Sequence, residues 1–207
     1  MNGLISGLVH TTLMLVNKEE DDEAEEEVAG DESLWCQAKA GQRLSCPKNM
    51  NILSVIGHQD ARDLKVVWGS DSRYWKWKTM QIGGLKMEVA ELKNVCWLEI
   101  NGKYAMKNLT GGSDYQVKFV VKLLKKFNID KPVTFSLTTP RGCKQEHTEN
   151  MMEMPRNKII TITAGEFEVP WNTYGCGEIS FSMMNTDGFW KRGLVVIGAL
   201  VLPKVNW

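Results

Sequence analysis

Short apolar runs separated by turn residues dominate the sequence from residue 62 onward. Runs of this length and spacing predict β-strands rather than helices. The expected strands are Leu64–Trp68, Tyr74–Met80, Cys96–Tyr104, Tyr115–Leu124, Val133–Thr139, Ile159–Thr163, Glu178–Met184 and Leu194–Leu202. Strands repeated at this spacing predict an all-β domain, a β-sandwich, over residues 62–207.

Within this pattern the segment Cys96–Tyr104 alternates, with Trp97 and Glu99 on one face and Leu98 and Ile100 on the other. Trp97 is expected in the core, as is Phe119. Because Asn-Gly is a strong turn signal, the strand is predicted to end at Ile100 and turn at Asn101-Gly102.

Two further segments need a structural assignment. Met87–Asn94 is predicted to be a short helical turn that carries Val89 and Leu92 inward. Gly193–Pro203 is apolar but about half the length of a membrane-spanning helix, and it contains two glycines and ends in proline. It predicts a central strand buried on both faces.

The N-terminal part of the chain differs from the rest. Residues 1–33 hold one lysine and ten acidic residues, eight of them in the run 19–27, and this arm is expected to be disordered. Residues 34–61 form a transition segment, with a short helix expected around Met50–Ile56. Met1–Val16 is fairly apolar, but it lacks a basic start and is too short to span a membrane, so neither secretion nor a membrane span is expected.

The formal charge of zero hides a basic body. The chain has 25 basic and 25 acidic residues, so residues 34–207 hold 24 basic and 15 acidic ones, a net charge of +9. A positive body can attract RNA or an acidic partner at long range. The charges are scattered along the sequence rather than clustered, which favours solubility as their role.

The residues that usually carry catalysis or bind metals are dispersed. The five cysteines form no CxxC pair, and the three histidines are isolated. Glu166, Glu168 and Glu178 are the carboxylates that a glycosidase would need, but nothing in the sequence fixes their separation. We therefore expect a protein that is not an enzyme and needs no metal or cofactor.

Aromatic residues are concentrated between Trp68 and Trp77, where ten residues hold three tryptophans and Tyr74. Planar rings stack on sugars or bases, and Asp71, Arg73 and the indole N–H groups supply directional hydrogen bonds. Asp71 and Arg73 either contact a ligand or hold the turn. Alternation along a strand would instead place some of these rings in the core.

Four ordered blocks carry a resemblance to a known family. They are Leu64-Lys-Val-Val-Trp68-Gly-Ser-Asp71-Ser-Arg73-Tyr74-Trp75-Lys-Trp77, Val89 to Ile100, Gly165-Glu166-Phe167, and Gly177-Glu178 through Trp190-Lys-Arg-Gly193 to Pro203. In these blocks the chain resembles phloem protein 2, the Nictaba-related lectin family. The F-box that many relatives carry is not recognisable in the first sixty residues.

The resemblance implies a jelly-roll-like β-sandwich that binds N-acetylglucosamine oligomers (chitooligosaccharides) and the cores of N-glycans. Trp68 and Trp75 match the two tryptophans of the family's site, and Glu178 matches its glutamate. A further acidic contact is expected just before Trp190, where the chain offers Asn185 and Asp187. Together with Asp71 and Tyr74 these residues make up the expected carbohydrate site, in which the paired indoles stand open to water over a carboxylate. Trp190 is expected either in the core or at the rim of this site.

The resemblance also implies a homodimer in the cytoplasm of phloem sieve elements and companion cells, with some nuclear presence. N-glycosylated proteins are then the expected partners. Two alternatives remain: an RNA-binding carrier that uses the same rings and the basic body, and a structural protein joined to phloem filament protein by disulfides.

Overall fold

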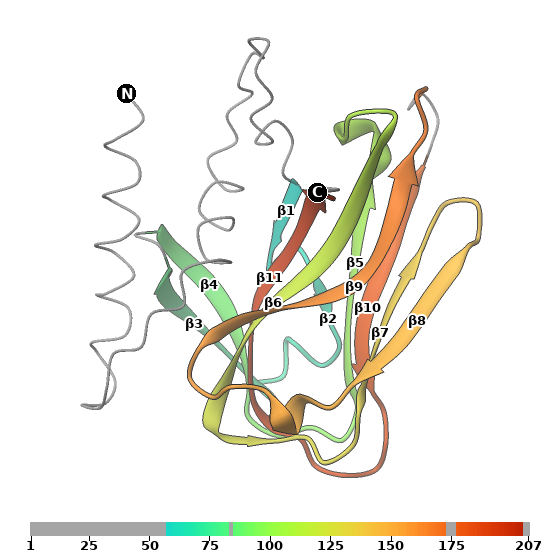
Figure 1. The fold of residues 1–207 in the computed structure, drawn as a ribbon. Coiled ribbons are helices and arrows are strands. Elements are labelled where there is room, and N and C mark those ends of the chain that lie inside the picture. Colours follow the sequence, from blue (N-terminus) through green and yellow to red (C-terminus); the bar gives the residue numbers. More distant parts are fainter. Residues whose placement is uncertain (1–56, 83–84, 173–176, 205–207) are drawn as a thin grey trace.

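The computed structural model describes residues 57–82, 85–172 and 177–204 (Figure 1). Within these ranges eleven antiparallel strands form two sheets, and the helical segments are the single turns η1 (Met106–Asn108) and η2 (Met151–Glu153). This confirms the predicted all-β, jelly-roll-like sandwich with short helical turns. The acidic arm 1–33 and the helix predicted at 50–56 lie outside the described residues. In the described part of the chain, no helix is long and apolar enough to cross a membrane.

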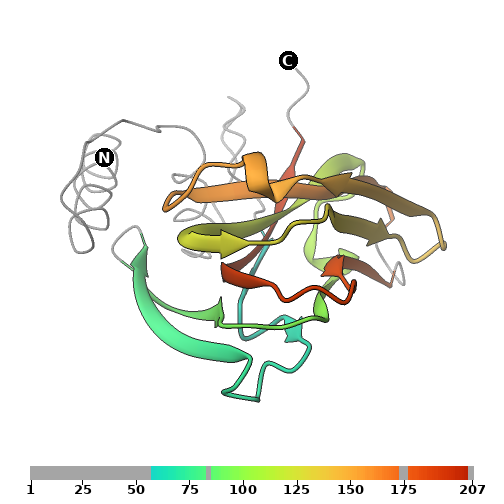
Figure 2. The ribbon, with the colours of Figure 1, turned by 90° about the horizontal axis from the view of Figure 1, so that it is seen from below.

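The larger sheet, called sheet A, has the strand order β3-β4-β11-β6-β9, and β1 also pairs with β11. Its strands are β1 (Gly57–Asp60), β3 (Trp75–Ile82), β4 (Leu85–Leu92), β6 (Ser113–Asn128), β9 (Ile159–Val169) and β11 (Arg192–Pro203). Residues 193–202 of β11 are all buried, which confirms the predicted central strand. Figure 2 shows the β3–β4 hairpin curving away at one side of the layered strands.

The smaller sheet, called sheet B, has the order β2-β5-β10-β7-β8. Its strands are β2 (Lys65–Val66), β5 (Leu98–Ala105), β7 (Val133–Thr138), β8 (Lys144–Glu149) and β10 (Glu178–Asn185). The pattern of apolar runs did not predict β8, because its six residues are all polar. They pair with β7 at the edge of the sheet, where polar side chains discourage pairing with other chains.

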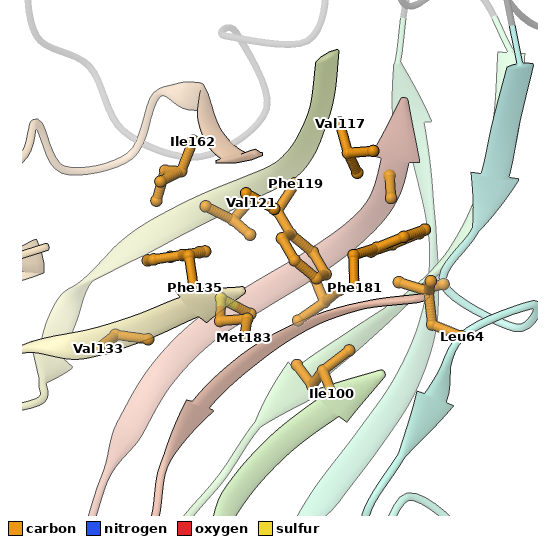
Figure 3. Packing of buried hydrophobic residues seen from close by; sticks show 14 of the residues in the cluster. Leu64, Ile100, Val117, Phe119, Val121, Val133, Phe135, Ile162, Phe181 and Met183 are labelled. Carbon is orange, nitrogen blue, oxygen red and sulfur yellow. The ribbon is translucent and has the colours of Figure 1, made fainter. Parts of the chain in front are cut away.

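The inner core lies between the sheets and is closed by aromatic contacts across them. Phe119 of β6 lies in it as predicted, with its ring centroid 5.9 Å from that of Phe135 on β7 and 5.6 Å from that of Phe181 on β10. Figure 3 shows these rings among branched aliphatic side chains from both sheets. Edge-to-face and tilted contacts of this kind stabilise a core beyond the area they bury.

Two local predictions were wrong. Met87–Asn94 is not a helical turn, because β4 pairs with β3 along its whole length. Val89 and Leu92 are three residues apart, so in a strand they point to opposite faces and enter different clusters. Asn101-Gly102 is not a turn either, since β5 continues through it to Ala105 and pairs with β10 there.

The packing around position 102 leaves no room for a side chain larger than that of glycine. A Cβ at this position would lie 2.3 Å from ring atoms of Phe181 and 2.9 Å from Leu64. The ring of the neighbouring strand occupies the space that any larger side chain would need, so the Asn-Gly pair reflects a close approach inside the sheet rather than a reversal of the chain.

We expect Gly102→Ala to lower the free energy of unfolding by about 1–3 kcal/mol, because the added methyl group overpacks the core against Phe181. Urea unfolding followed by tryptophan fluorescence measures this change. Gly188→Ala is the matched control, since a Cβ there would meet nothing within 4 Å. Equal stability of the two variants would contradict the packing explanation.

Candidate functional site

The loop after β2 presents Trp68 to solvent on a firmly anchored backbone. The Trp68 side chain is 56% exposed, and its φ of 61° lies in the left-handed region that non-glycine residues rarely adopt. Two indole N–H groups of β3 hold the loop: Trp75 Nε1 donates to the Val67 carbonyl at 3.0 Å, and Trp77 Nε1 to the Gly69 carbonyl at 2.7 Å. These bonds help to hold a backbone conformation that would otherwise be strained.

The position of Trp75 differs from the expected one. Its side chain is only 1% exposed and belongs to the inner core, so the expectation of two indoles open to water is wrong for this ring. Trp75 is the first residue of β3 and pairs with Leu92, which turns its ring inward. Of the pair seven residues apart, Trp68 offers a ring face to a ligand and Trp75 supports the loop.

Tyr74 and Asp71 complete this loop. The Tyr74 ring lies 6.1 Å from the Trp68 ring at an interplanar angle of 59°, and it is half-buried. Asp71 accepts hydrogen bonds from the Arg73 backbone N–H and, through both carboxylate oxygens, from the Arg73 guanidinium. These bonds from Arg73 lower the pKa of Asp71 below its usual value. In this structure the two residues hold the turn.

A second loop, which leads into β5, adds Trp97. Its side chain is 50% exposed, so the prediction that it lies in the core was wrong, although it does share a face with Glu99 as expected. Trp97 Nε1 donates to Glu99 Oε2 at 2.7 Å and Asn101 Nδ2 to Glu99 Oε1 at 2.9 Å. The bond from Trp97, followed by that from Asn101, lowers the pKa of Glu99, so its carboxylate is charged at neutral pH.

A third loop, between β10 and β11, is fastened to the second by Lys191. This lysine is 1% exposed, and its Nζ donates to the carbonyls of Cys96, Asp187 and Phe189 and to the Asp187 carboxylate at 2.6–2.9 Å. A backbone bridge between Val95 and Lys191 reinforces the junction. Phe189 and Trp190 extend from this loop with more than half of each side chain exposed, which places Trp190 outside the core.

Together the three loops form what we call the aromatic end: Trp68, Tyr74, Trp97, Phe189 and Trp190. The first two loops are also joined, because Lys93 Nζ donates to the Ser72 carbonyl and the Lys93 N–H to the Tyr74 carbonyl. The carboxylates of Asp71 and Asp187 belong to the first and third loops, and the Glu99 carboxylate accepts a hydrogen bond from Trp97. Rings with open faces beside fixed carboxylates suit stacking and hydrogen bonding to a flat polar ligand. No group of metal-ligating side chains occurs in the described ranges.

The two remaining acidic candidates lie at different ends of the sandwich. Glu178 pairs with Ala105, whereas the residue before Trp68 bonds to Glu99. Those positions are six residues apart on β5, about 20 Å along the strand, so the structure does not bring Glu178 to Trp68. Asp187 does lie at the aromatic end, where its carboxylate forms the ion pair with Lys191.

Asp187 and, as one of two alternatives, Trp190 were expected at this surface, whereas Trp97 was expected in the core and Phe189 was not foreseen. The signal available for Trp97 was the shared face with Glu99, which is polar. For Phe189 the signal was its position directly after the turn residues Asp187-Gly188. Neither signal shows which loops of a sandwich lie together at one end; that follows from the pairing of β5 with β2 and β10.

The fold and the aromatic end define a β-sandwich with an exposed aromatic surface on its loops. The sequence profile of the phloem protein 2 family matches residues 58–203, which is well over half of the chain. The protein belongs to this family, as the four sequence blocks predicted.

Similar proteins include members of the family from several plants. The chain is 40% identical over 149 residues to Protein PHLOEM PROTEIN 2-LIKE A1 of Arabidopsis thaliana, covering 70% of this chain and 60% of that protein. It is 37% identical over 145 residues to a protein named Lectin from Luffa acutangula, covering 70% and 68%. A Lectin from Coccinia grandis is 26% identical over 142 residues, covering 68% and 89%. The match thus covers less than two thirds of the A1 protein.

Among solved structures, the xylan-binding CBM22-1 domain of Paenibacillus barcinonensis Xyn10C is similar with a TM-score of 0.40 and 12% identity. The match covers 71% of this chain and 90% of that one. A likeness at this level carries no argument about ligand or activity.

We expect Trp75→Ala to destabilise the protein by about 3–5 kcal/mol, because it empties a fully buried site and removes the bond to Val67. Trp97→Ala removes an equally large ring that is half exposed and is expected to cost much less. Urea unfolding of both variants at pH 7 measures the difference. A cost for Trp75→Ala no larger than that for Trp97→Ala would show that the ring is not part of the core.

The ion pair between Asp187 and Lys191 is expected to make stability depend on acid. Burial raises the pKa of Asp187, but the hydrogen bonds from Lys191 and from the Phe189 N–H, the charge of Lys191 and a bond involving Asn185 together lower it further. Because the folded pKa lies below the unfolded one, the carboxylate stabilises the fold above about pH 4 and loses this effect as the pH falls through the folded value.

The free energy of unfolding of the parent protein should therefore exceed that of Asp187→Asn at pH 7, and this difference should be smaller at pH 3. Urea unfolding at both pH values tests it, with the exposed Asp130→Asn as control. A difference that does not change with pH would contradict this role.

Proposed function

We propose that the protein is a non-enzymatic lectin that binds N-acetylglucosamine oligomers and the cores of N-glycans through the aromatic end. The observation that carries the proposal is the exposed Trp68 ring, set beside Tyr74 on a loop that two indole N–H groups anchor. Two relatives in the same family are named lectins, which supports carbohydrate as the ligand class.

The chemistry of the ligand fits these groups. One face of a pyranose carries axial C–H groups and stacks on an indole, while its hydroxyls donate to carboxylates. Glu99 is charged, partly exposed and held by hydrogen bonds from Trp97 and Asn101, and its remaining lone pairs can accept hydrogen bonds from sugar hydroxyls. The acetamido methyl group packs against a second ring such as Tyr74.

The expected affinity is modest. A stacked ring contributes about 1–2 kcal/mol, so two or three occupied subsites give a dissociation constant in the micromolar to millimolar range. A homodimer would present two aromatic ends and raise the apparent affinity for clustered glycans. We propose further that the protein acts in the cytoplasm of phloem cells, an expectation that rests only on the resemblance to phloem lectins.

The basic body favours RNA as the second candidate ligand. Residues 34–207 carry a net charge of +9, and exposed rings also stack on bases. Salt separates the two ligands. Binding to RNA weakens steeply as salt rises from 50 to 500 mM, because counterions are released, whereas binding to a neutral sugar changes little.

We expect Trp68→Ala to weaken binding of the N-acetylglucosamine trimer about tenfold, the effect of losing one stacked ring of about 1.4 kcal/mol. Isothermal titration calorimetry at 150 mM salt measures the dissociation constant. Trp171→Ala is the matched control, since this indole is even more exposed but follows β9 beside Gly112.

If Trp68→Ala binds the trimer as tightly as the parent protein, or if only Trp171→Ala loses affinity, the sugar does not bind at the aromatic end. Binding of RNA but not of the trimer by the parent protein, with the steep salt dependence, would favour the second candidate.

A further inference from the structure

Sheet A carries a second apolar surface on the side that faces away from sheet B. We call it the outer face. Its side chains form one contiguous cluster that crosses four strands: Ile82, Met87, Val89, Val120, Val195, Ile197, Leu200 and Leu202. Met80, Leu85, Leu124 and Ile159 pack against its margins.

The outer face is buried, although nothing described lies across it. The eight central side chains are 0–4% exposed. Within residues 57–82, 85–172 and 177–204, every strand belongs to one of the two sheets, and η1 and η2 insert Met106 and Met151 into the inner core. The cover of a face this apolar must therefore come from outside these ranges, since a sheet face left to water would cost its full hydrophobic free energy.

The charged residues of the outer face are lysines gathered around Glu91 and carboxylates farther along the strands. Lys118 and Lys122 alternate with Val120 and Leu124 on β6, so they point to the same side. Lys78 and Lys126 lie there too and form ion pairs with Glu91, at 3.0 and 3.2 Å. Among the described residues, Glu91 is the acidic partner of Lys78 and Lys126. The other carboxylates on this side are Asp60, which pairs with Gly198, and Asp114, Glu166 and Glu168, which lie toward the end of β6 and β9 away from Lys122 and Ile159.

The N-terminal arm has the complementary composition. Apolar residues in its first half, Leu4, Ile5, Leu8 and Val9, recur three and four positions apart, the spacing of one apolar helical face. The run of eight acidic residues at 19–27 follows. Sixteen helical residues measure about 24 Å, and the five strands β3-β4-β11-β6-β9 are about 19 Å across, so the lengths match.

The connection between the arm and the sheet also permits docking. The described chain begins at Gly57, which pairs with Val201 between the outer-face residues Leu200 and Leu202. Residues 28–56 are 29 residues long and span up to about 95 Å, far more than the width of the sheet. Residues 34–56 carry more basic than acidic side chains, so the lysines favour the acidic arm over this nearer segment.

We propose that residues 1–27 of the same chain dock on the outer face of sheet A. The apolar residues 4–16 cover the cluster on β4, β6 and β11, and the acidic run 19–27 lies beside the lysines of β6 and β3. The arm is then a structural layer of the fold rather than a solvated tail.

Zero-length carbodiimide cross-linking of the full chain tests the proposal, because it joins a carboxylate to a lysine only where the two are in contact. A mixture of unlabelled and nitrogen-15-labelled chains, digested and analysed by mass spectrometry, separates links within one chain from links between copies. We expect links within one chain from residues 19–27 to Lys118, Lys122 or Lys126.

A pair of matched double variants tests the apolar contact. In Leu4→Asp/Leu8→Asp, carboxylates enter the docked face, and the yield of these links is expected to fall at least about fivefold while binding of the dye ANS rises. Asn2→Asp/Ser6→Asp adds the same charge at polar positions and is expected to keep the yield within about twofold of the parent value.

Three results would overturn the proposal. The first is the absence of links from 19–27 to these lysines in the parent chain. The second is links only between copies, which would assign the face to a second molecule. The third is links only from Asp31 or Glu32, or equal yields in the two double variants, which would assign the cover to the segment after the arm or to charge alone.

Discussion

The fold depends on the burial of a sheet that is apolar on both sides. Along β11, Leu194 and Val196 enter the inner core while Val195 and Ile197 enter the outer cluster, so neither face of this strand tolerates water. Sheet B differs, because its outward positions are polar, such as Ser136 and Ser182, whose hydroxyls bond at 2.8 Å. The sandwich is therefore asymmetric: sheet B meets solvent on one side, and sheet A requires a layer on each side.

The aromatic end shows how such a scaffold can expose rings without losing order. Polar atoms of buried and half-buried side chains anchor the loops. The indole N–H groups of Trp75 and Trp77 bond to the backbone that carries Trp68, and Lys191 joins the two loops that carry Trp97 and Trp190. Since these loops are fixed before a ligand arrives, binding would lose little conformational entropy. That matters for a weak ligand such as a short oligosaccharide, which offers few contacts in return.

Much of the strand pattern could be predicted from apolar spacing, and most of the contacts between strands could not. Alternation predicted the first part of β5, and a continuous apolar run predicted the doubly buried β11. Neither pattern could show that the ring of Phe181 lies over Gly102, because that ring belongs to another strand. The same limit explains the site. The seven-residue spacing of Trp68 and Trp75 is visible in the sequence, yet which ring turns inward depends on the point where β3 begins to pair with β4. The separation of Glu178 from Trp68 depends likewise on the register of β10 against β5.

The aromatic end and the outer face of sheet A pack against different parts of the interior. Trp75 and the half-buried Tyr74 and Trp77 pack on the inner core, and Lys191 closes its loops by bonding to main-chain carbonyls. None of these anchors belongs to the outer cluster on sheet A. Residues that share no partner and lie well apart contribute to stability almost independently. The covering of the outer face can therefore set the stability of sheet A while the aromatic end keeps its geometry, because the loops that hold the rings are tied to the layer between the sheets.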